Sequence, residues 1–248
     1  MAPQFRTRDG HAMKSFRFNA SDASARSASG GDEFAARRAE MIESQLRRRG
    51  VTDPKVLAAM NSVRREEFIP SDLRPRAYED SPLPIGEGQT ISQPYIVAAM
   101  TAALDLSGGE RVLEVGAGCG YQAAVLSHLA KDVFTIECRP PLATAAAARL
   151  AQLGYANVHV HCGDGTLGLP DCAPFDAILV AAAAPAVPSP LRSQLAEGGR
   201  LIVPVGDADN QDLQLVERSG TSFQTRTLEA CRFVPLVGFY GWKGPPAQ

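Results

Sequence analysis

The chain has 248 residues, of which 45% are hydrophobic, and a formal net charge of −2 at neutral pH. This length can bury a substantial core, as one large domain or two small ones. The charge argues against nucleic acid or an anionic membrane as the main partner, because such proteins usually carry a basic excess. No apolar run approaches the ~20 residues that span a bilayer. The five cysteines include no C-x-x-C pair, which indicates reduced thiols and a cytoplasmic protein.

The first 31 residues differ in composition from the rest of the chain. They hold five basic residues against two acidic ones, are rich in serine and alanine, and lack the apolar segment of a secretory signal. We expect a disordered basic tail with no catalytic role; a transit peptide is the alternative.

Three helices are predicted between this tail and the first long strand. Asp32 can cap a helix that ends at Gly50. A second helix starts at the pair Asp53–Pro54, since an acidic cap followed by proline is a common helix start. A loop rich in proline and glycine follows, and a third helix is expected over residues 93–104.

From residue 107 onward, apolar β-branched runs alternate with helical patterns, which indicates parallel strands covered on both faces. The last two strands follow without helices, so the sheet should finish in an antiparallel hairpin. The predicted fold class is α/β, a doubly wound, mostly parallel sheet of about seven strands, in one domain of residues 32–243 whose sheet begins at residue 107. The expected strands are "RVLEVG" (111–116), "VFTIE" (133–137), "VHVHC" (158–162), "FDAILVAAAA" (175–184), "GRLIVPVG" (199–206), "LQLVER" (213–218) and "TRTLEACRFVPLVG" (225–238), and the expected helices cover residues 121–130, 140–154 and 187–199.

Three glycines follow the first of these strands at every second position, namely Gly116, Gly118 and Gly120. Glycine permits a tight turn into the next helix, and without Cβ atoms the backbone amides can contact a ligand. The second strand ends in Glu137, 21 residues after Gly116. That is the place and spacing of an acid that binds both ribose hydroxyls of a nucleoside cofactor.

The third strand is followed by "GDG", which contains Asp164 and Gly165. Asp164 can accept a hydrogen bond from an adenine amine, and Gly165 allows a ligand to approach the backbone closely. Because ligands of such sheets bind at the carboxyl ends of the strands, the glycine turn and the two acids together predict a nucleoside-cofactor site.

The combination resembles the class I S-adenosylmethionine-dependent methyltransferases. Dinucleotide-binding dehydrogenases are the weaker alternative, because their third glycine comes one place later, where this chain has Tyr121. Cys119 could be read as a nucleophile on a strand-to-helix elbow, but Ala117 and Tyr121 stand where that motif requires glycines. We expect no metal, since His159, His161 and Cys162 lie on one short strand without further clustered ligands.

The segment before the sheet resembles a narrower family, the protein-L-isoaspartate O-methyltransferases. Its hallmark "GQTISQP" stands at residues 88–94, and the resemblance extends over about residues 33–240. The chain departs from the family pattern at Ala181 and in "CRPP" (138–141). Further matching segments are "EEFIP" (66–70), "GDGTLG" (163–168), "APFDAILV" (173–180) and "RFVPLVG" (232–238).

The resemblance implies S-adenosylmethionine as cofactor, S-adenosylhomocysteine as its product, and isoaspartyl-containing proteins and peptides as substrates. We expect a monomer. The free α-carboxylate of an isoaspartyl residue is ionised at neutral pH, because the pKa of such a group lies near ~3.5. No general base is then required, and catalysis should come from positioning and partial dehydration. A module that binds the cofactor but has lost catalysis is the alternative.

The resemblance also implies the roles of single residues. Ser92 would contact the reacting carboxylate, and the segment of residues 32–106 would hold the substrate loop. Ser92 could instead cap the helix that begins at Pro94. The segment "RFVPL" (232–236) could add the substrate peptide as a strand, or could be an ordinary late strand. The expected substrate-binding residues are Thr90, Ile91, Val234, Pro235 and Leu236, and the expected cofactor-binding residues are Gly116, Gly118, Gly120, Tyr121, Gln122, Glu137, Asp164 and Gly165.

Overall fold

The computed structural model describes residues 33–243. The predicted tail of residues 1–31 and the helix cap at Asp32 lie outside the described residues. The chain divides into two compact units, residues 1–36 and 37–248, and the fold below is that of the second unit. Within the described range, no helix is long and apolar enough to cross a membrane.

The end of the first helix and the start of the second lie where the sequence predicts. The first helical segment continues through a π-helical turn, η1 (Ile42–Leu46), and a 3₁₀ turn, η2 (Arg47–Arg49). It ends at Gly50, whose φ of 93° is the left-handed conformation of a glycine cap. Helix α2 (Pro54–Ser62) begins at Asp53, whose carboxylate accepts a hydrogen bond of 2.8 Å from the backbone N–H of Lys55. The 3₁₀ turns η3 (Arg65–Phe68) and η4 (Ser71–Arg76) follow.

The loop predicted before the third helix contains a β-hairpin that the sequence analysis missed. Strands β1 (Leu83–Gly86) and β2 (Gln89–Ile91) pair antiparallel. The two residues between them, Glu87 and Gly88, have φ values of 52° and 67°, as in a type I′ turn. Helix α3 (Pro94–Ala103) starts three residues after β2, close to the predicted bounds.

The sheet confirms the predicted fold class. Its seven strands lie in the order β5-β4-β3-β6-β7-β8-β9. The first five in this order are parallel, and β8 and β9 are antiparallel to their neighbours, so the sheet ends in the expected hairpin. The strands are β3 (Arg111–Val115), β4 (Asp132–Glu137), β5 (Val158–Cys162), β6 (Phe175–Val180), β7 (Leu195–Gly206), β8 (Gln211–Ser219) and β9 (Ser222–Cys231).

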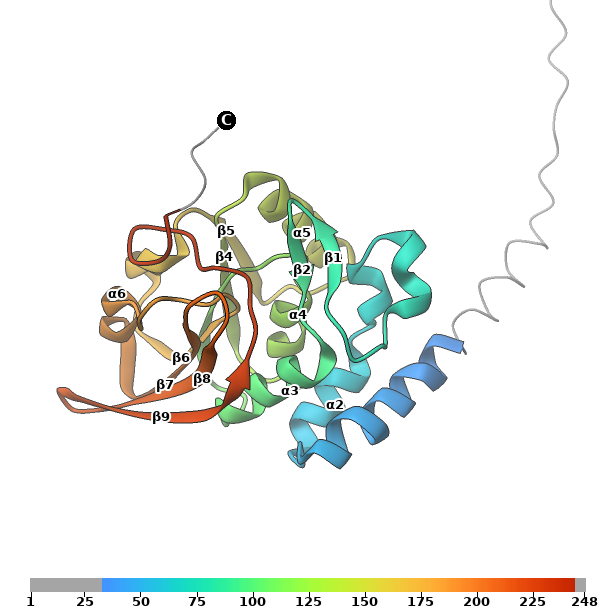
Figure 1. Ribbon diagram of the computed structural model, residues 1–248, viewed down its shortest axis with the longest axis horizontal. Coiled ribbons are helices and arrows are strands. Elements are labelled where there is room, and N and C mark those ends of the chain that lie inside the picture. Colours follow the sequence, from blue (N-terminus) through green and yellow to red (C-terminus); the bar gives the residue numbers. More distant parts are fainter. Residues whose placement is uncertain (1–32, 244–248) are drawn as a thin grey trace, which may run out of the picture. The chain divides into compact units, whose positions relative to one another are not determined.

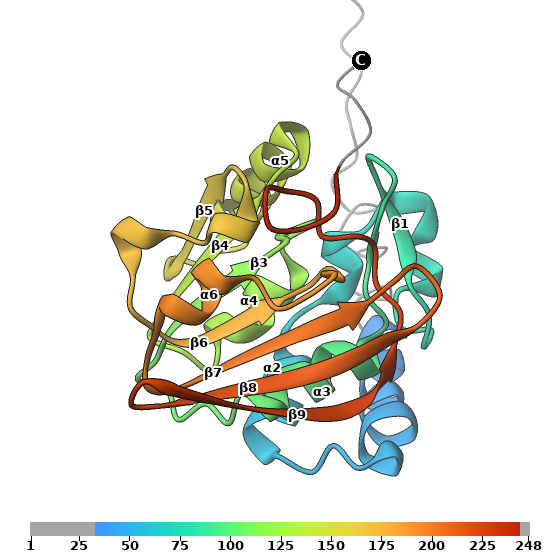
Figure 2. The ribbon, with the colours of Figure 1, turned by 60° about the vertical axis from the view of Figure 1, so that its left-hand side comes forward.

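Helices cover the parallel strands from both sides (Figures 1 and 2). Helices α4 (Tyr121–Ser127) and α5 (Pro140–Gln152) connect strands that step from β3 toward β5, whereas α6 (Ser189–Ser193) connects β6 to β7 in the opposite direction. Because such crossovers are right-handed, α6 lies on the opposite face from α4 and α5. The strand order therefore reverses beside β3, and the edge at its carboxyl end is where such a sheet binds ligands. The 3₁₀ turns η5 (Gly165–Leu167) and η6 (Pro170–Cys172) precede β6.

Several predicted elements are shorter than the sequence suggested. Strand β6 stops at Val180, and the alanines after it form only isolated bridges. Helix α6 covers five residues of the predicted range 187–199, because β7 already begins at Leu195. Strand β9 ends at Cys231, so residues 232–238 are not an ordinary late strand; Pro235 has no N–H to donate to a ladder.

Candidate active site

The glycine turn after β3 adopts the conformation that only glycine reaches easily. The φ values of Gly116, Gly118 and Gly120 are 95°, 53° and 91°. Gly116 and Gly118 line a cavity at the carboxyl ends of the strands, but Gly120 does not. A Cβ atom on Gly120 would lie 3.1 Å from Cδ1 of Leu150, so this glycine allows α4 to start against α5.

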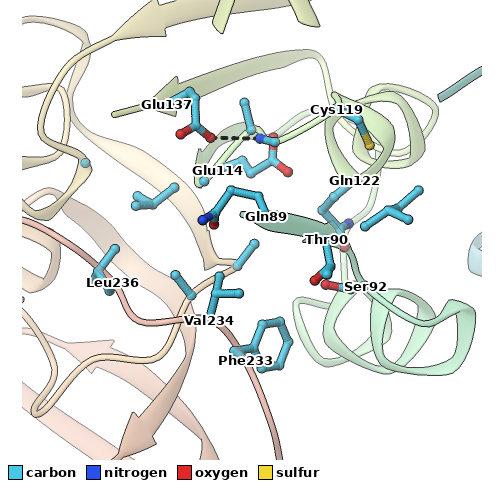
Figure 3. Close-up of a pocket in the computed structure, with 18 of the residues that line it drawn as sticks. Gln89, Thr90, Ser92, Glu114, Cys119, Gln122, Glu137, Phe233, Val234 and Leu236 are labelled. Carbon is cyan, nitrogen blue, oxygen red and sulfur yellow. Dashed lines mark hydrogen bonds between the residues drawn. The ribbon is translucent and has the colours of Figure 1, made fainter. Parts of the chain in front are cut away.

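Glu137 lies across the turn from these glycines, at the end of β4. Its Oε2 accepts a hydrogen bond of 2.9 Å from the N–H of Gly118, drawn in Figure 3, and its Oε1 accepts one of 3.1 Å from the N–H of Arg139. The side chain lines the cavity although the residue is only 5% exposed. A carboxylate fixed by two backbone amides still has lone pairs for the two hydroxyls of a ribose, so this wall fits a nucleoside cofactor.

The second predicted acid behaves differently. Asp164 does not line the cavity; its Oδ1 accepts hydrogen bonds from the N–H and hydroxyl of Thr166 at 2.9 and 2.6 Å. Its Oδ2 accepts one of 2.8 Å from the N–H of Phe239 and so holds the loop after residue 237. Its contact with adenine stays a prediction. Gly165 does line the cavity, and a Cβ there would lie 2.5 Å from Cγ1 of Val115, so packing against β3 also requires glycine.

Tyr121 and Gln122, from the first turn of α4, line the same cavity. The Tyr121 ring is buried, and the guanidinium carbon of Arg65 lies 4.9 Å from its centroid. Gln122 donates a hydrogen bond of 2.9 Å from Nε2 to the hydroxyl of Thr101. Residues that do not line the cavity, Arg65 and Thr101, therefore hold the side chains of Tyr121 and Gln122 in place.

The opposite wall contains every residue predicted to bind substrate. Thr90, Ile91 and Ser92 enter the cavity from β2 and the residue after it, and residues 234–236 enter from the segment after β9. Figure 3 shows the hydroxyls of Thr90 and Ser92 beside each other at this wall. Helix α3 has Gln93 as its N-cap and no side chain caps it, so Ser92 is not the helix cap.

The backbone after β9 is largely engaged. Ala183 receives a hydrogen bond from the N–H of Leu236 and donates one to the carbonyl of Val234, both 2.8 Å long. The side chain of Gln211 binds the N–H and the carbonyl of Phe233. Strand addition of a peptide along residues 232–236 would therefore find few free backbone groups.

The sequence analysis missed one buried acid in this cavity, Glu114 in the middle of β3. Its Oε2 is 2.5 Å from the hydroxyl of Thr135, and its Oε1 has no hydrogen-bond partner in the described part of the chain. Burial raises the pKa of this carboxyl to about 8, with a smaller contribution from the nearby charge of Glu137. A single acid inside an apolar run was the only signal. The other lining residues that were not predicted are Gln89, Val97, Met100, Val115, Ala117, Cys119, Ile136, Cys138, Ala181, Ala182, Phe233 and Val237, which include both departures from the family pattern.

The described residues contain no group of three His, Cys, Asp or Glu side chains that could hold a metal ion. The cavity combines a wall suited to a nucleoside with a wall of hydroxyl and apolar groups.

The chain is similar to proteins of one family along most of its length. A family model described as protein-L-isoaspartate(D-aspartate) O-methyltransferase (PCMT) matches residues 36–240. The protein-L-isoaspartate O-methyltransferase of Roseiflexus castenholzii is 56% identical over 210 residues, which cover 85% of this chain and 96% of that one. Protein-L-isoaspartate O-methyltransferase 1 of Rhodopseudomonas palustris is 57% identical over 212 residues, 84% of this chain and 86% of that one.

Solved structures agree with these relatives. One protein-L-isoaspartate O-methyltransferase matches with a TM-score of 0.74 and 32% identity, over 82% of this chain and 67% of that one. A Plasmodium falciparum structure assigned to the same enzyme, in complex with S-adenosyl-L-homocysteine, matches with a TM-score of 0.69 and 25% identity, over 81% of this chain and 98% of that one.

Proposed function

Because the chain belongs to the protein-L-isoaspartate O-methyltransferase family, we propose that the cavity between the glycine turn and β2 is its active site. The family and the fold class expected from the sequence are confirmed. The reaction is S-adenosylmethionine-dependent methylation of the free α-carboxylate of L-isoaspartyl residues in damaged proteins and peptides, which initiates their repair to L-aspartyl.

The residues of β3, β4 and the turn between β3 and α4 would hold the cofactor. Glu137 would accept from the ribose hydroxyls, and the open backbone at Gly116 and Gly118 leaves room for the ligand chain. When bound, S-adenosylmethionine supplies a methyl group on a positively charged sulfur. The positive φ values of the turn and the fixed carboxylate of Glu137 are the features that fit this cofactor.

The opposite wall, formed by residues 89–92 and 234–236 and named the acceptor wall, would position the isoaspartyl residue that accepts the methyl group. Its carboxylate arrives ionised, so no residue has to remove a proton. The hydroxyl of Ser92 can donate to one carboxylate oxygen, and the N-terminus of the ten-residue helix α3 favours an anion there. Ile91 and Leu236 are buried beside this place and exclude water, which removes part of the hydration shell of the attacking oxygen.

The observation that carries this proposal is the hydroxyl of Ser92, which has no hydrogen-bond partner among the described residues and lies in the same cavity as Glu137. Transfer of labelled methyl to an isoaspartyl peptide, but not to its aspartyl twin, is the expected result. Equal labelling of both peptides would contradict the substrate, and labelling of neither would favour a binding module without catalysis.

The Ser92→Ala variant tests the role of the serine. Losing one hydrogen bond to a charged group costs about 1.5–3 kcal/mol, which corresponds to a roughly 10- to 150-fold slower transfer. The melting temperature should change little, because no cap is lost. A variant that transfers methyl at the wild-type rate in single-turnover experiments would exclude Ser92 from the chemistry.

We also propose a cytoplasmic monomer with one catalytic domain, residues 32–243, in which residues 32–106 contribute the acceptor wall. None of the five cysteines forms a disulfide, which is typical of a reducing compartment. Light scattering at working concentration should give the mass of one chain; a stable dimer would contradict the proposal.

A further inference from the structure

The charges that line the active-site cavity are unusual for a site that binds an anion. Two carboxyl groups, those of Glu114 and Glu137, lie in its lining. In the part of the chain that the structure describes, the lining includes no lysine, arginine or histidine. Within this cavity, the acceptor carboxylate of the proposed reaction would therefore meet neutral donors.

Three side chains of the acceptor wall can donate without carrying charge: those of Thr90, Ser92 and Gln89. Gln89 is the only one of the three with two N–H donors. Its one hydrogen bond, from Nε2 to the carbonyl of Glu87, is 3.4 Å long and therefore weak. Figure 3 shows its carboxamide pointing into the cavity, between the wall of Glu137 and that of Val234. The other glutamine of the lining, Gln122, is bound to Thr101 instead.

The hairpin fixes Gln89 at the place where the two walls meet. Gln89 pairs with Gly86 directly after the two-residue turn, so the register leaves it little freedom. On the same hairpin, Cδ1 of Ile85 lies 3.3 Å from the position that a Cβ of Gly118 would take. The hairpin thus packs over the glycine turn and brings Gln89 next to the cofactor wall.

We propose that Gln89 is a further acceptor-binding residue, whose carboxamide donates to the isoaspartyl carboxylate together with the hydroxyl of Ser92. The inference rests on the proposed function. It also explains why the described lining contains no cationic side chain. The carboxylate loses its charge as the ester forms, so an arginine or lysine would stabilise the reactant more than the transition state and slow the reaction. A neutral donor still makes a charge-assisted hydrogen bond to the carboxylate, but it lacks the charge–charge attraction of an ion pair and so wastes less of this energy.

The variants Gln89→Ala and Gln89→Glu test the proposal, with Glu87→Gln as the matched control. Glu87 is exposed at the tip of the same hairpin, and its side chain does not line the cavity. We measure kcat and KM for an isoaspartyl peptide, the Kd of S-adenosylmethionine by calorimetry, and the Kd of the peptide in the presence of S-adenosylhomocysteine.

Gln89→Ala should lower kcat/KM about 10- to 100-fold, mainly through KM, and weaken peptide binding to the same degree. Gln89→Glu should lower kcat/KM further, because a carboxylate at this position repels the acceptor. The Kd of the cofactor should stay within about twofold in both, and that unchanged binding also shows that the variants fold. Glu87→Gln should behave as wild type.

Two results would overturn the inference: wild-type peptide affinity in either Gln89 variant, or a loss of cofactor affinity as large as the loss in kcat/KM. The second result would assign Gln89 to the cofactor instead. A wild-type protein that does not methylate the isoaspartyl peptide would refute the proposed function itself, before any variant is compared.

Discussion

Replacement of Glu114 by glutamine should make the stability of the protein less dependent on pH. The carboxyl is fully buried in β3, and burial raises its pKa from 4.5 to about 8. In the unfolded chain the group ionises near its ordinary pKa. The contribution of the protonated Glu114 carboxyl to stability is therefore fully present below pH 4.5. It is lost as the pH rises through the pKa that this carboxyl has in the folded protein.

The size of the effect follows from the two pKa values. The two pKa values differ by about 3.5 units, and one unit corresponds to about 1.36 kcal/mol, so this carboxyl alone should cost the wild type about 5 kcal/mol of unfolding free energy between about pH 4.5 and pH 8. Glutamine has a similar shape and can still bond to Thr135, but it does not ionise. Relative to wild type, Glu114→Gln should therefore gain stability steadily over this range.

Urea unfolding of both proteins at several pH values measures the difference directly. The control is Glu87→Gln, which makes the same chemical change at an exposed turn and should follow the wild-type profile. Parallel pH profiles for Glu114→Gln and wild type would refute the argument, because they would mean that the carboxyl ionises in place without penalty.

Two further substitutions test the cofactor wall, and a third tests the loop that Asp164 holds. Glu137→Ala should weaken S-adenosylmethionine binding at least about tenfold, since two charge-assisted hydrogen bonds of about 1.5–3 kcal/mol each are lost; unchanged affinity by calorimetry would remove Glu137 from the site. Gly118→Val should abolish cofactor binding in a folded protein, because the backbone has a φ of 53° and a Cβ would crowd Ile85 at 3.3 Å; normal binding would mean that the turn is only a tight connection. Asp164→Ala should free the backbone N–H of Phe239 and speed its hydrogen exchange, and unchanged exchange would contradict the bracing role of this carboxylate.

The cofactor wall could be predicted from the sequence because its signals are local. Three glycines directly after a buried strand leave few conformations open, and the position of Glu137 follows from the spacing of one strand–helix–strand unit. The side chain of Asp164 could not be predicted in the same way. Its hydrogen bond to Phe239 joins residues 75 positions apart, which no local pattern contains.

The acceptor wall was predicted only through the resemblance to a family. Strands β1 and β2 are four and three residues long, and their turn places Glu87, rather than the usual Asn or Gly, at a φ of 52°. Neither the periodicity nor the turn residues therefore indicated a hairpin. Glu114 was missed for a different reason. The apolar run predicted a strand covered on both faces, but no local signal places the one acid within it in a cavity, which only the tertiary structure shows.

The lack of cationic side chains in the lining leads to a last prediction, on how the two ligands depend on each other. The acceptor brings a negative charge to a cavity that already contains the carboxylate of Glu137, and no described lining residue offsets it. The positive sulfur of the cofactor is then the counter-charge, and two unit charges about 4 Å apart attract by about 1 kcal/mol in water and about 4 kcal/mol at an effective dielectric constant of about 20. An isoaspartyl peptide should consequently bind at least about fivefold more tightly beside an unreactive, positively charged cofactor analogue than beside neutral S-adenosylhomocysteine, as measured by calorimetry. Equal affinity in the two complexes would show that the protein itself supplies the charge. Arg232, which lines the adjoining groove beside Phe233, would then be the first residue to replace.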